Sequence, residues 1–327
     1  MTRRVLITGG AGFIGHHLAR RMLEDGWAVT VLDNESTGRR EDVPDECDYV
    51  FGDVNCGEDL DRAFEPTPDV VFHVAGQASN IRCFDNPTQD IRANLLGTTN
   101  VVEKCVERKV RKLVYAGSMT AYGEMKHLPV REDAPLRPIS YYGIGKAAAE
   151  RFVLATARRT DLPFRFSATV FRMFNVYGPG QSLSNPYQGV LAIFIGRLLR
   201  AEPCVIYSDG RQTRDLVFID DVTRAWAATA VNGRADGEAI NLASGRSMSV
   251  LQMVESVCRE LGMDPGTYPM RFEAGRPGDQ VHTAADIAKA ARVLEWRPMT
   301  AFEEGLRTTI DWAQAVSALR KRADSRA

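Results

Sequence analysis

The sequence lacks long apolar runs, a strong net charge and any ordered pattern of cysteines. No stretch approaches the roughly 18 uninterrupted apolar residues that indicate a membrane-spanning helix, so no membrane partner is expected. The formal net charge is −1, which predicts no basic surface for nucleic acid. The six cysteines form no C-x-x-C pair and no cluster with histidine, so neither a disulfide framework nor a metal site is expected. The chain enters a strand pattern without a charged-then-apolar leader, and we expect a cytoplasmic protein.

Short apolar runs that alternate with helical patterns predict an α/β fold. Runs typical of buried strands cover residues 5–8, 28–32, 49–51, 70–73, 112–116 and 165–171. Helical spacing separates them over residues 16–25, 60–64, 89–109 and 144–158. Because strands that alternate with helices form parallel sheets, we expect a doubly wound sheet of the Rossmann type.

The second half of the chain predicts a smaller C-terminal lobe. A chain of 327 residues exceeds the size at which one core stops growing. From Asn175 onward, proline and glycine punctuate shorter elements, with helical patterns over 190–200, 220–231 and 250–261 and a short strand at 271–272. We expect the sheet domain over residues 1–175 and mainly the smaller lobe over 176–327. Within residues 214–243, the strand-like segments 216–219 and 239–242 are candidates to return to the first sheet.

The run Val-Leu-Ile-Thr-Gly-Gly-Ala-Gly-Phe-Ile-Gly at residues 5–15 indicates a strand that turns into a helix through backbone alone. Gly9, Gly12 and Gly15 recur at three-residue spacing, which leaves N–H groups at the helix N-terminus free to hold a pyrophosphate. Phe13 and Ile14 belong to the same candidate cofactor loop. The spacing differs from the usual G-x-G-x-x-G, and glycines at such a junction also occur as plain turn chemistry.

Asp33 strengthens the prediction of a dinucleotide. It closes the apolar run 28–32, 18 residues after Gly15, where a carboxylate can accept hydrogen bonds from both ribose hydroxyls. The two signals together predict NAD as the cofactor, preferred over NADP because Asp33 would repel a 2′-phosphate. Arg39 and Arg40 are the neighbouring residues that could reverse this preference.

A tyrosine and a lysine at helical spacing are the candidate catalytic pair. In Ser-Tyr-Tyr-Gly-Ile-Gly-Lys, Tyr142 precedes Lys146 by four residues, so both side chains lie on one helix face. A phenol titrates near pH 10 and is a poor base at neutral pH. A nearby ammonium, aided by an oxidised nicotinamide, is expected to bring the pKa of Tyr142 toward the working range. The same spacing also occurs by chance in many helices.

The chain resembles the extended short-chain dehydrogenase/reductases, specifically the NAD-dependent nucleotide-sugar epimerase/dehydratase family. The resemblance covers residues 5 to about 312, and the residues that carry it are the glycine run at 8–15, Asp33, Ser118, Tyr142 and Lys146. It implies that Tyr142 is the acid/base and that Lys146 holds the nicotinamide ribose and lowers the pKa of the tyrosine. It also implies that Ser118 bonds the sugar hydroxyl.

The residues after Ser118 imply the class of reaction. In the sugar 4,6-dehydratases the equivalent residue is followed by Asp-Glu, and in the uronate decarboxylases a Glu occupies the second following position. Elimination needs such an acid, whereas this chain has Met119 and Thr120. The Cys and Lys pair common in 3,5-epimerising members is also absent from these two positions. The resemblance therefore implies an NAD-dependent nucleoside-diphosphate-sugar 4-epimerase of the UDP-glucose/UDP-galactose type, acting through a transient 4-keto sugar.

Later motifs resemble the family's substrate-binding segments. Asn175, in Arg-Met-Phe-Asn-Val-Tyr-Gly-Pro, is implied to bond the sugar diphosphate, and Arg214 and Arg276 are implied to clamp it. A guanidinium can satisfy two phosphate oxygens at once, although a structural ion pair is the alternative for each arginine. Thr283, seven residues after Arg276, resembles a position where some members carry a bulky tyrosine, and the threonine implies room for an N-acetyl group.

Three further residues have weaker signals. Asp53 resembles the family aspartate that bonds the adenine amine, with a cap at a strand end as the alternative. His73 opens a segment that resembles the loop over the cofactor, and its imidazole is expected to be structural. Asn94 resembles an asparagine that supports the site, with a buried helix residue as the alternative.

Rival functions remain open at this point. They are a dTDP- or UDP-deoxysugar or uronate 4-epimerase, an NAD(P)H-dependent 4-keto-sugar reductase and, from another class, a non-catalytic nucleotide-binding sensor. Residues 182–195 resemble a loop of members that use dTDP-deoxysugars, which leaves the nucleotide undecided. The family also implies a homodimer formed through the helices at 89–109 and 144–158.

Overall fold

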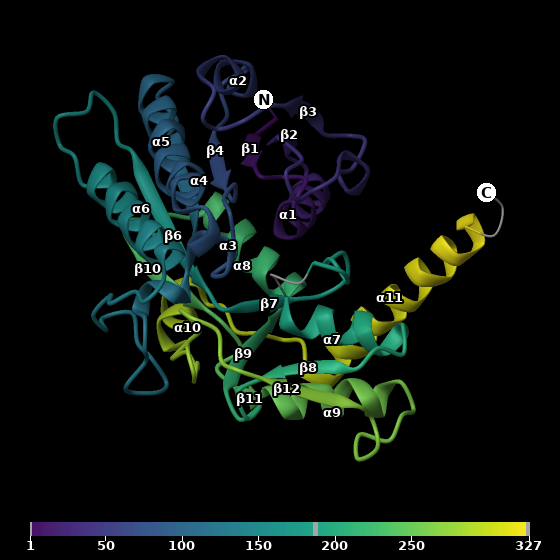
Figure 1. Cartoon of the computed structure of the whole chain (residues 1–327). Coiled ribbons are helices and arrows are strands. Elements are labelled where there is room, and N and C mark those ends of the chain that lie inside the picture. Colours follow the sequence, from purple (N-terminus) through teal and green to yellow (C-terminus); the bar gives the residue numbers. More distant parts are fainter. Residues whose placement is uncertain (1, 186–188, 325–327) are drawn as a thin grey trace.

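The computed structural model describes residues 2–185 and 189–324, which form a sheet domain and a smaller lobe (Figure 1). Residues 186–188, inside the segment compared above with dTDP-deoxysugar enzymes, lie outside this range. The main sheet has seven parallel strands in the order β3-β2-β1-β4-β5-β6-β10. The chain order runs in opposite directions from β1, which is the topology of a doubly wound sheet and confirms the predicted fold class.

The strands of the main sheet coincide closely with the apolar runs. Their bounds are β1 (Arg4–Thr8), β2 (Ala28–Asp33), β3 (Asp48–Phe51), β4 (Val70–His73), β5 (Lys112–Ser118), β6 (Ser167–Met173) and β10 (Ala239–Leu242). Every residue of β4, β5 and β10 is buried. Such strands read as continuous apolar runs because helices cover both faces of a parallel sheet.

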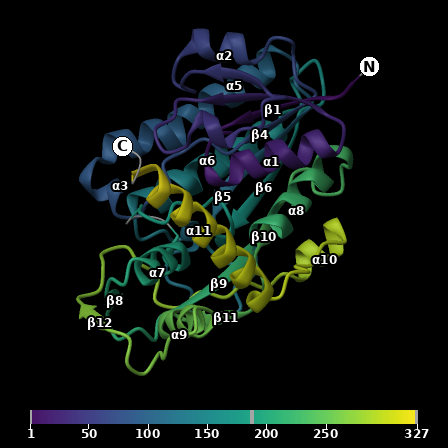
Figure 2. The ribbon, with the colours of Figure 1, turned by 90° about the vertical axis from the view of Figure 1, so that its right-hand side faces the viewer.

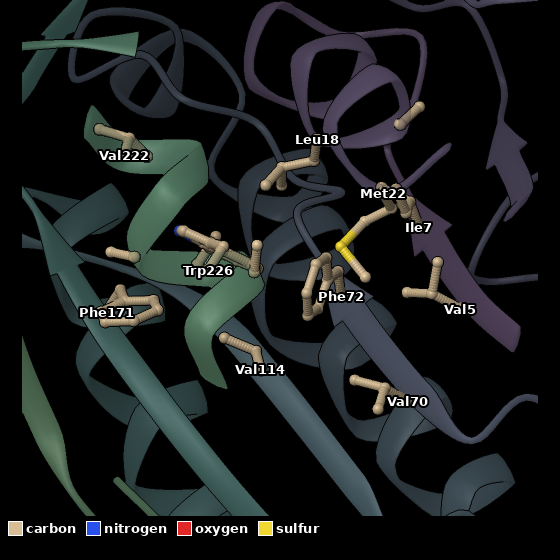
Figure 3. Packing of buried hydrophobic residues seen from close by; sticks show 14 of the residues in the cluster. Val5, Ile7, Leu18, Met22, Val70, Phe72, Val114, Phe171, Val222 and Trp226 are labelled. Atoms are coloured by element: carbon tan, nitrogen blue, oxygen red, sulfur yellow. The ribbon is translucent and has the colours of Figure 1, made fainter. Parts of the chain in front are cut away.

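Helices pack on both faces of this sheet. On one face α1 (Phe13–Glu24) and α8 (Ile219–Val231) lie side by side, with α10 (Ala288–Leu294) next to α8 (Figure 2). In this layer Trp226 of α8 contacts Phe72 of β4 and Phe171 of β6, with ring centroids 5.3 and 5.5 Å apart (Figure 3). The opposite face is covered by α2 (Gly57–Ala63), α5 (Gly97–Glu107) and α6 (Tyr141–Ala157).

The helix expected over residues 89–109 is interrupted, so that prediction is wrong in its continuity. The structure has α4 (Pro87–Ile91), a π-helical turn (Arg92–Leu96) and then α5, and the short α3 (Arg82–Asp85) precedes them. Within the turn, Asn94 is fully buried and its carbonyl oxygen accepts a hydrogen bond from Thr98 Oγ1 at 2.7 Å. π-Turns of this kind occur mainly at functional sites, and this one turns Asn94 toward the loop after β4.

The smaller lobe has two sheets and three long helices. The first sheet contains β7 (Asn175–Tyr177), β9 (Thr213–Phe218) and β11 (Ser247–Ser249), and the second pairs β8 (Cys204–Tyr207) with β12 (Met270–Glu273). Helices α7 (Val190–Leu199), α9 (Val250–Glu260) and α11 (Phe302–Asp324) enclose a separate apolar core with these strands. Figure 1 shows this lobe below the carboxyl ends of the main strands, with α11 running outward to the C-terminus.

The two segments expected to return to the first sheet behave differently. Residues 239–242 do return, because β10 pairs in parallel with β6 at the edge of the main sheet. Residues 216–219 do not, and that expectation is wrong: β9 pairs with β7 and β11 in the smaller lobe. The physical reason is that β10 already occupies the free edge of β6, while α8, which follows β9, covers the face of the sheet.

None of the helices within residues 2–185 and 189–324 is long and apolar enough to cross a membrane. The six cysteines are free.

Two short helical turns complete the described elements, η1 (Arg40–Asp42) after β2 and η3 (Met119–Tyr122) after β5. The second of these turns begins directly after Ser118, at the end of a central strand.

Candidate active site

A cleft of about 740 Å³ lies between the carboxyl ends of the main strands and the smaller lobe. Its sheet side is formed by residues that follow β1, β2, β3, β4 and β5, and its other wall comes from β7, α7, β8 and β9. Ligands of open parallel sheets bind at this edge, where the strand order reverses. The structure therefore brings most of the predicted site residues into one cavity.

The glycine loop forms one end of the cleft through tight backbone packing. Gly9 has φ +71°, and a Cβ there would lie 2.6 Å from Ala75 N. Gly12 is the N-cap of α1 and lines the cleft with Phe13 and Ile14, and no side chain caps the helix. The first-turn N–H groups of α1 are thus open to an anionic ligand.

Gly15 lies in the first turn of α1 and packs against the glycine loop. A Cβ at this position would lie 2.2 Å from Gly9 O, so the residue lets the helix pack against the loop. Gly15 is not among the described residues that line the cleft. Close packing of the helix on the loop at this position keeps the glycine loop in its shape.

Asp33 lines the cleft at the end of β2. Its carboxylate accepts hydrogen bonds from Ala11 N at 2.9 Å and Glu35 N at 2.7 Å. Burial raises the pKa of Asp33, and these N–H groups act in the opposite direction. Asp53 also lines the cleft, and its carboxylate accepts a hydrogen bond from Asn34 Nδ2 at 2.7 Å.

The two arginines after β2 are turned to other partners. Arg39 pairs with Asp42 at 2.9 Å, and Arg40 pairs with Asp45 at 3.7 Å and lies over the Tyr49 ring. Neither arginine is among the described residues that line the cleft. The charge nearest to a ribose held by β2 is therefore that of Asp33, which favours NAD over NADP.

Ser118, Tyr142 and Lys146 meet at the centre of the cleft. Ser118 ends β5, and the other two lie on the first turns of α6, whose N-cap Ser140 accepts a hydrogen bond from Gly143 N. All three are buried, with exposed fractions of 7%, 9% and 4%. Ser118 Oγ accepts hydrogen bonds from Thr120 N at 3.2 Å and from Thr120 Oγ1 at 2.9 Å. These two donors leave the Ser118 proton free to point at Tyr142 or at a ligand.

In the protein without a bound nicotinamide, burial dominates the pKa of Tyr142. Burial raises this pKa to about 12, and a hydrogen bond with Ser118 opposes the rise. Lys146 Nζ donates a hydrogen bond to Ala116 O at 3.0 Å and lies 5.9 Å from the centre of the Tyr142 ring. Burial also lowers the pKa of Lys146 to about 8. Desolvation therefore dominates the pKa of both residues, and we expect a bound group to stabilise the phenolate.

The substrate side of the cleft contains two arginines, Arg214 and Arg276, on which the carboxylate of Asp279 acts from beyond 4.0 Å. Arg276 stacks over the Tyr207 ring at 3.6 Å from its centre and donates a hydrogen bond to its hydroxyl. Arg214 donates to Thr213 O at 2.9 Å, and burial lowers its pKa. Within the described part of the chain neither guanidinium has a carboxylate within 4.0 Å. Asn175 adds a buried Oδ1 atom that has no hydrogen-bond partner within the described ranges. Guanidinium groups and an unsatisfied amide fit a polar, anionic ligand.

Three candidates, Thr283, His73 and Asn94, are not among the described residues that line the cleft. Thr283 is fully buried, and its Oγ1 donates to Thr213 O and accepts from Asp215 N, both at 3.3 Å. It thus lies behind the described wall of the cleft. His73 is buried between Thr8 Oγ1 at 2.7 Å and Thr98 Oγ1 at 2.9 Å, a structural position.

Asn94 supports the loop after β4. Its Nδ2 donates to Gln77 O at 2.9 Å and to Asp90 Oδ1 at 3.0 Å, and its Oδ1 is buried without a partner. Because Gln77 lines the cleft, Asn94 holds a wall of the site in place without facing it.

The sequence did not single out several residues that line the cleft. They are Arg197 on α7, Tyr207 at the end of β8, and Asp279 and Gln280 after β12. Asp279 follows Arg276 within Gly-Arg-Pro-Gly-Asp, so its motif was available as a signal. Arg197 and Tyr207 have no such local signal, because an arginine on a helix and a tyrosine on a strand are ordinary. No cluster of three or more His, Cys, Asp or Glu suited to a metal ion occurs among the residues described.

Comparison with known proteins agrees with this geometry. The family model described as "NAD dependent epimerase/dehydratase family" matches residues 5–243. A UDP-glucose 4-epimerase of Mycolicibacterium smegmatis is 34% identical over 94% of this chain and 98% of its own length. Relatives named as a dehydratase and as a decarboxylase of nucleotide sugars are 30% identical.

Solved structures superpose over nearly the whole chain. A UDP-glucose 4-epimerase of Thermotoga maritima with UDP-glucose has a TM-score of 0.90 and 34% identity, and covers 96% of this chain and 99% of its own. A UDP-glucose 4-epimerase of Thermus thermophilus in complex with NAD has a TM-score of 0.87 and 34% identity, with 95% and 99% covered.

Proposed function

The chain belongs to the NAD-dependent epimerase/dehydratase family, and we propose that it interconverts nucleoside-diphosphate sugars as a 4-epimerase of the UDP-glucose type. NAD is the cofactor of the family, and the glycine loop and Asp33 supply the contacts that a dinucleotide needs. When bound, NAD supplies the hydride acceptor for carbon 4 of the sugar. The enzyme needs no external reductant, because the sugar leaves with the oxidation state it had on entry.

The single observation that carries this proposal is the set of groups next to Ser118. The carboxylates among the described residues that line the cleft are Asp33, Asp53 and Asp279. The first two follow β2 and β3 at the cofactor end, and the third lies near Arg214 and Arg276. Beside Ser118, the cleft instead presents Met119 and Thr120. An elimination or a proton exchange at carbon needs an acid or base there, whereas 4-epimerisation needs only a hydroxyl proton to move.

The proposed role of each residue follows from its position in the cleft. We assign Tyr142 as the group that takes the proton from the sugar 4-hydroxyl and returns it, with Ser118 bonding the same hydroxyl. Lys146 lies beneath both and contributes positive charge and a hydrogen-bond donor. We assign Arg214, Arg276 and Asn175 to the diphosphate at the other end of the cleft, because a guanidinium can bond two phosphate oxygens at once.

An isotope experiment tests the proposed reaction. We expect UDP-glucose deuterated at carbon 4 to give UDP-galactose with the label retained at carbon 4, in light water and with one equivalent of NAD per site. NMR of the product reports the position of the label. Loss of the label to water would indicate enolisation, and a stoichiometric demand for NADH or NADPH would indicate a reductase. Either result contradicts the proposal.

A panel of substrates tests the nucleotide and the sugar. We expect turnover of UDP-glucose, and the structural relatives crystallised with UDP-glucose support this choice over dTDP-deoxysugars. UDP-N-acetylglucosamine and dTDP-sugars are the comparison substrates. A higher kcat/KM for a dTDP-sugar would retain the 4-epimerase reaction and overturn the UDP-glucose assignment.

We also propose that the protein is a homodimer through α4 to α6. Large apolar side chains are exposed on these packed helices, and they are Ile91 (50%), Leu96 (46%), Tyr141 (44%) and Ile144 (51%). Their burial against a second copy would remove an exposed apolar patch. We expect multi-angle light scattering to give twice the chain mass for the wild type and a smaller mass for Ile144→Lys. A monomeric wild type at micromolar concentration would contradict this.

A further inference from the structure

One buried carboxylate lies behind the catalytic residues and has no part in the proposed chemistry. Asp90, on α4, has an exposed fraction of 0%. Its Oδ1 accepts hydrogen bonds from Asn94 Nδ2 and Gln77 Nε2, both at 3.0 Å. Its Oδ2 is buried and has no hydrogen-bond partner among the residues that the structure describes. A carboxylate is costly to bury, and one with an unsatisfied oxygen needs an opposite charge nearby.

The opposite charge is that of Lys146. A Cβ built on Gly145, the residue before this lysine, would lie 3.5 Å from Asp90 Oδ2, so α6 passes close to the carboxylate at this point. The absence of a side chain at 145 leaves that space open. Lys146 Nζ is held by Ala116 O at 3.0 Å and lies 5.0 Å from the centre of the Tyr115 ring, and in the described chain it has no carboxylate within 4.0 Å. The carboxylate of Asp90 acts on this positive charge from beyond 4.0 Å.

Few other titratable groups face Asp90. From α6 these are Lys146 and Tyr142, from β5 Tyr115, and from the α3 segment Cys83. On the outer side, Asp90 lines a second cavity of about 230 Å³ with Arg82 and Asp85. The electrostatic effect of Asp90 raises the pKa of Lys146, whereas burial lowers it to about 8. Asp90 also raises the pKa of Tyr142. The carboxylate thus acts on both members of the catalytic pair.

We propose that Asp90 is a positioning residue, the fixed counter-charge that keeps Lys146 protonated in the buried site while its other oxygen holds Asn94 and Gln77. The inference rests on the proposed roles of Tyr142 and Lys146. Removing one negative charge lowers the proton affinity of every neighbouring group. Without Asp90, Lys146 loses its proton at lower pH, and the site loses the positive charge beneath the tyrosine. The same change makes Tyr142 easier to ionise.

The test measures Lys146 directly. The chain has seven lysines, so labelling with [¹³Cε]lysine gives few NMR signals, and Lys146→Arg identifies the one of interest. We expect the wild-type signal to titrate near pH 8 and the Asp90→Asn signal to titrate about one pH unit or more lower. Asp85→Asn is the matched control, because it removes the same charge from an exposed position that lines the same second cavity. We expect it to leave the Lys146 titration in place.

Activity supplies a second, independent readout. We expect both limbs of the kcat/KM pH profile to move to lower pH in Asp90→Asn, because both Lys146 and Tyr142 lose the same negative neighbour. A purely structural role would lower activity at every pH without moving the limbs. An unchanged Lys146 titration in folded Asp90→Asn overturns the proposal. If that variant does not fold, the wild type still decides, because a Lys146 that is neutral at pH 7 overturns it as well. Absence of all epimerase activity would overturn the proposed function, while the NMR titration would still test Asp90.

Discussion

At the scale of single residues, the site is governed by the cost of burying charge. Tyr142 and Lys146 both have pKa values displaced toward their neutral forms, because burial is the largest effect on each of them. Arg214 and Arg276 face the cleft without a carboxylate within 4.0 Å in the described chain, so their charge is available to a ligand. We expect the charged forms of these four residues to gain stabilising partners when substrate and cofactor bind.

Tyr142→Phe tests the acid/base at this scale. We expect turnover to fall by about 10²-fold or more, because the variant keeps the ring but loses the group that moves the proton. The free energy of unfolding and NAD binding are expected to stay close to those of the wild type. Steady-state kinetics and calorimetry check this. Tyr141→Phe is the matched control, since its side chain is exposed and adjacent. Near-normal turnover in Tyr142→Phe would remove this residue from the mechanism.

Arg276→Ala is expected to act on binding rather than on chemistry. Loss of charge-assisted hydrogen bonds of about 1.5–3 kcal/mol corresponds to a Kd for UDP-glucose raised roughly 10- to 100-fold. The kcat changes little, because a clamp remote from carbon 4 serves ground and transition states alike. Arg211→Ala is the control, because that side chain is exposed. An unchanged Kd measured by titration calorimetry would give Arg276 a structural role.

At the scale of elements, the junction of β1 and α1 depends on backbone packing. The Cβ that alanine would add at Gly15 would lie 2.2 Å from Gly9 O and 2.6 Å from Gly10 Cα. Because both distances are too short, the helix or the loop would have to move. The interrupted helix α4 to α5 is the second such element, since its π-turn positions Asn94. Both elements shape the cleft through their backbones more than through their side chains.

Gly15→Ala tests the junction. We expect the free energy of unfolding to fall by about 1–3 kcal/mol, the usual scale for overpacking, and NAD binding to weaken. Urea unfolding and NAD titration measure the two effects. Gly57→Ala is the matched control, because a Cβ at that helix start meets nothing within 4 Å. Equal stability of Gly15→Ala and wild type would show that the loop adapts at no cost.

At the scale of the whole molecule, the two lobes have separate cores that are joined around the cleft. Segments distant in the chain build each lobe, such as α1 against α8 in the sheet domain and the Thr213–Thr283 contact in the smaller lobe. Buried histidines add a dependence of stability on pH. Burial lowers the pKa of His16 to about 4 and that of His73 to about 3.

The stability of the whole chain is therefore expected to fall in mild acid. The unfolded chain binds protons at these histidines below about pH 6.5, whereas the folded chain does not until pH 4 or lower. The contribution of each neutral, buried histidine to the free energy of unfolding is fully present above pH 6.5 and is lost as the pH falls from 6.5 toward 4. The loss is about 2 kcal/mol per histidine at pH 5. Urea unfolding at pH 7 and pH 5 measures this loss.

A histidine variant apportions the effect. We expect His16→Asn to lose about 2 kcal/mol less than the wild type between the two pH values. The same substitution at His127, which lies on the surface, is the matched control. An equal loss in His16→Asn and wild type would assign the acid sensitivity to other groups.

The sequence by itself determined the features that depend on neighbouring residues. The strand–turn–helix at residues 5–15, Asp33 at the end of β2, and Tyr142 and Lys146 on one helix face follow from local backbone geometry and from helical periodicity. The strands of the main sheet were predictable for the same reason, because strands buried on both faces are continuous apolar runs.

Only the tertiary structure decided what depends on residues far apart in the chain. It placed β9 in the smaller lobe, Gly15 beneath the loop and Thr283 behind the described wall of the cleft, and it turned Arg39 and Arg40 toward acidic partners. It also raised the pKa of Tyr142. The physical reason is that burial and electrostatic environment are sums over all the atoms that surround a group, and folding alone brings those atoms together.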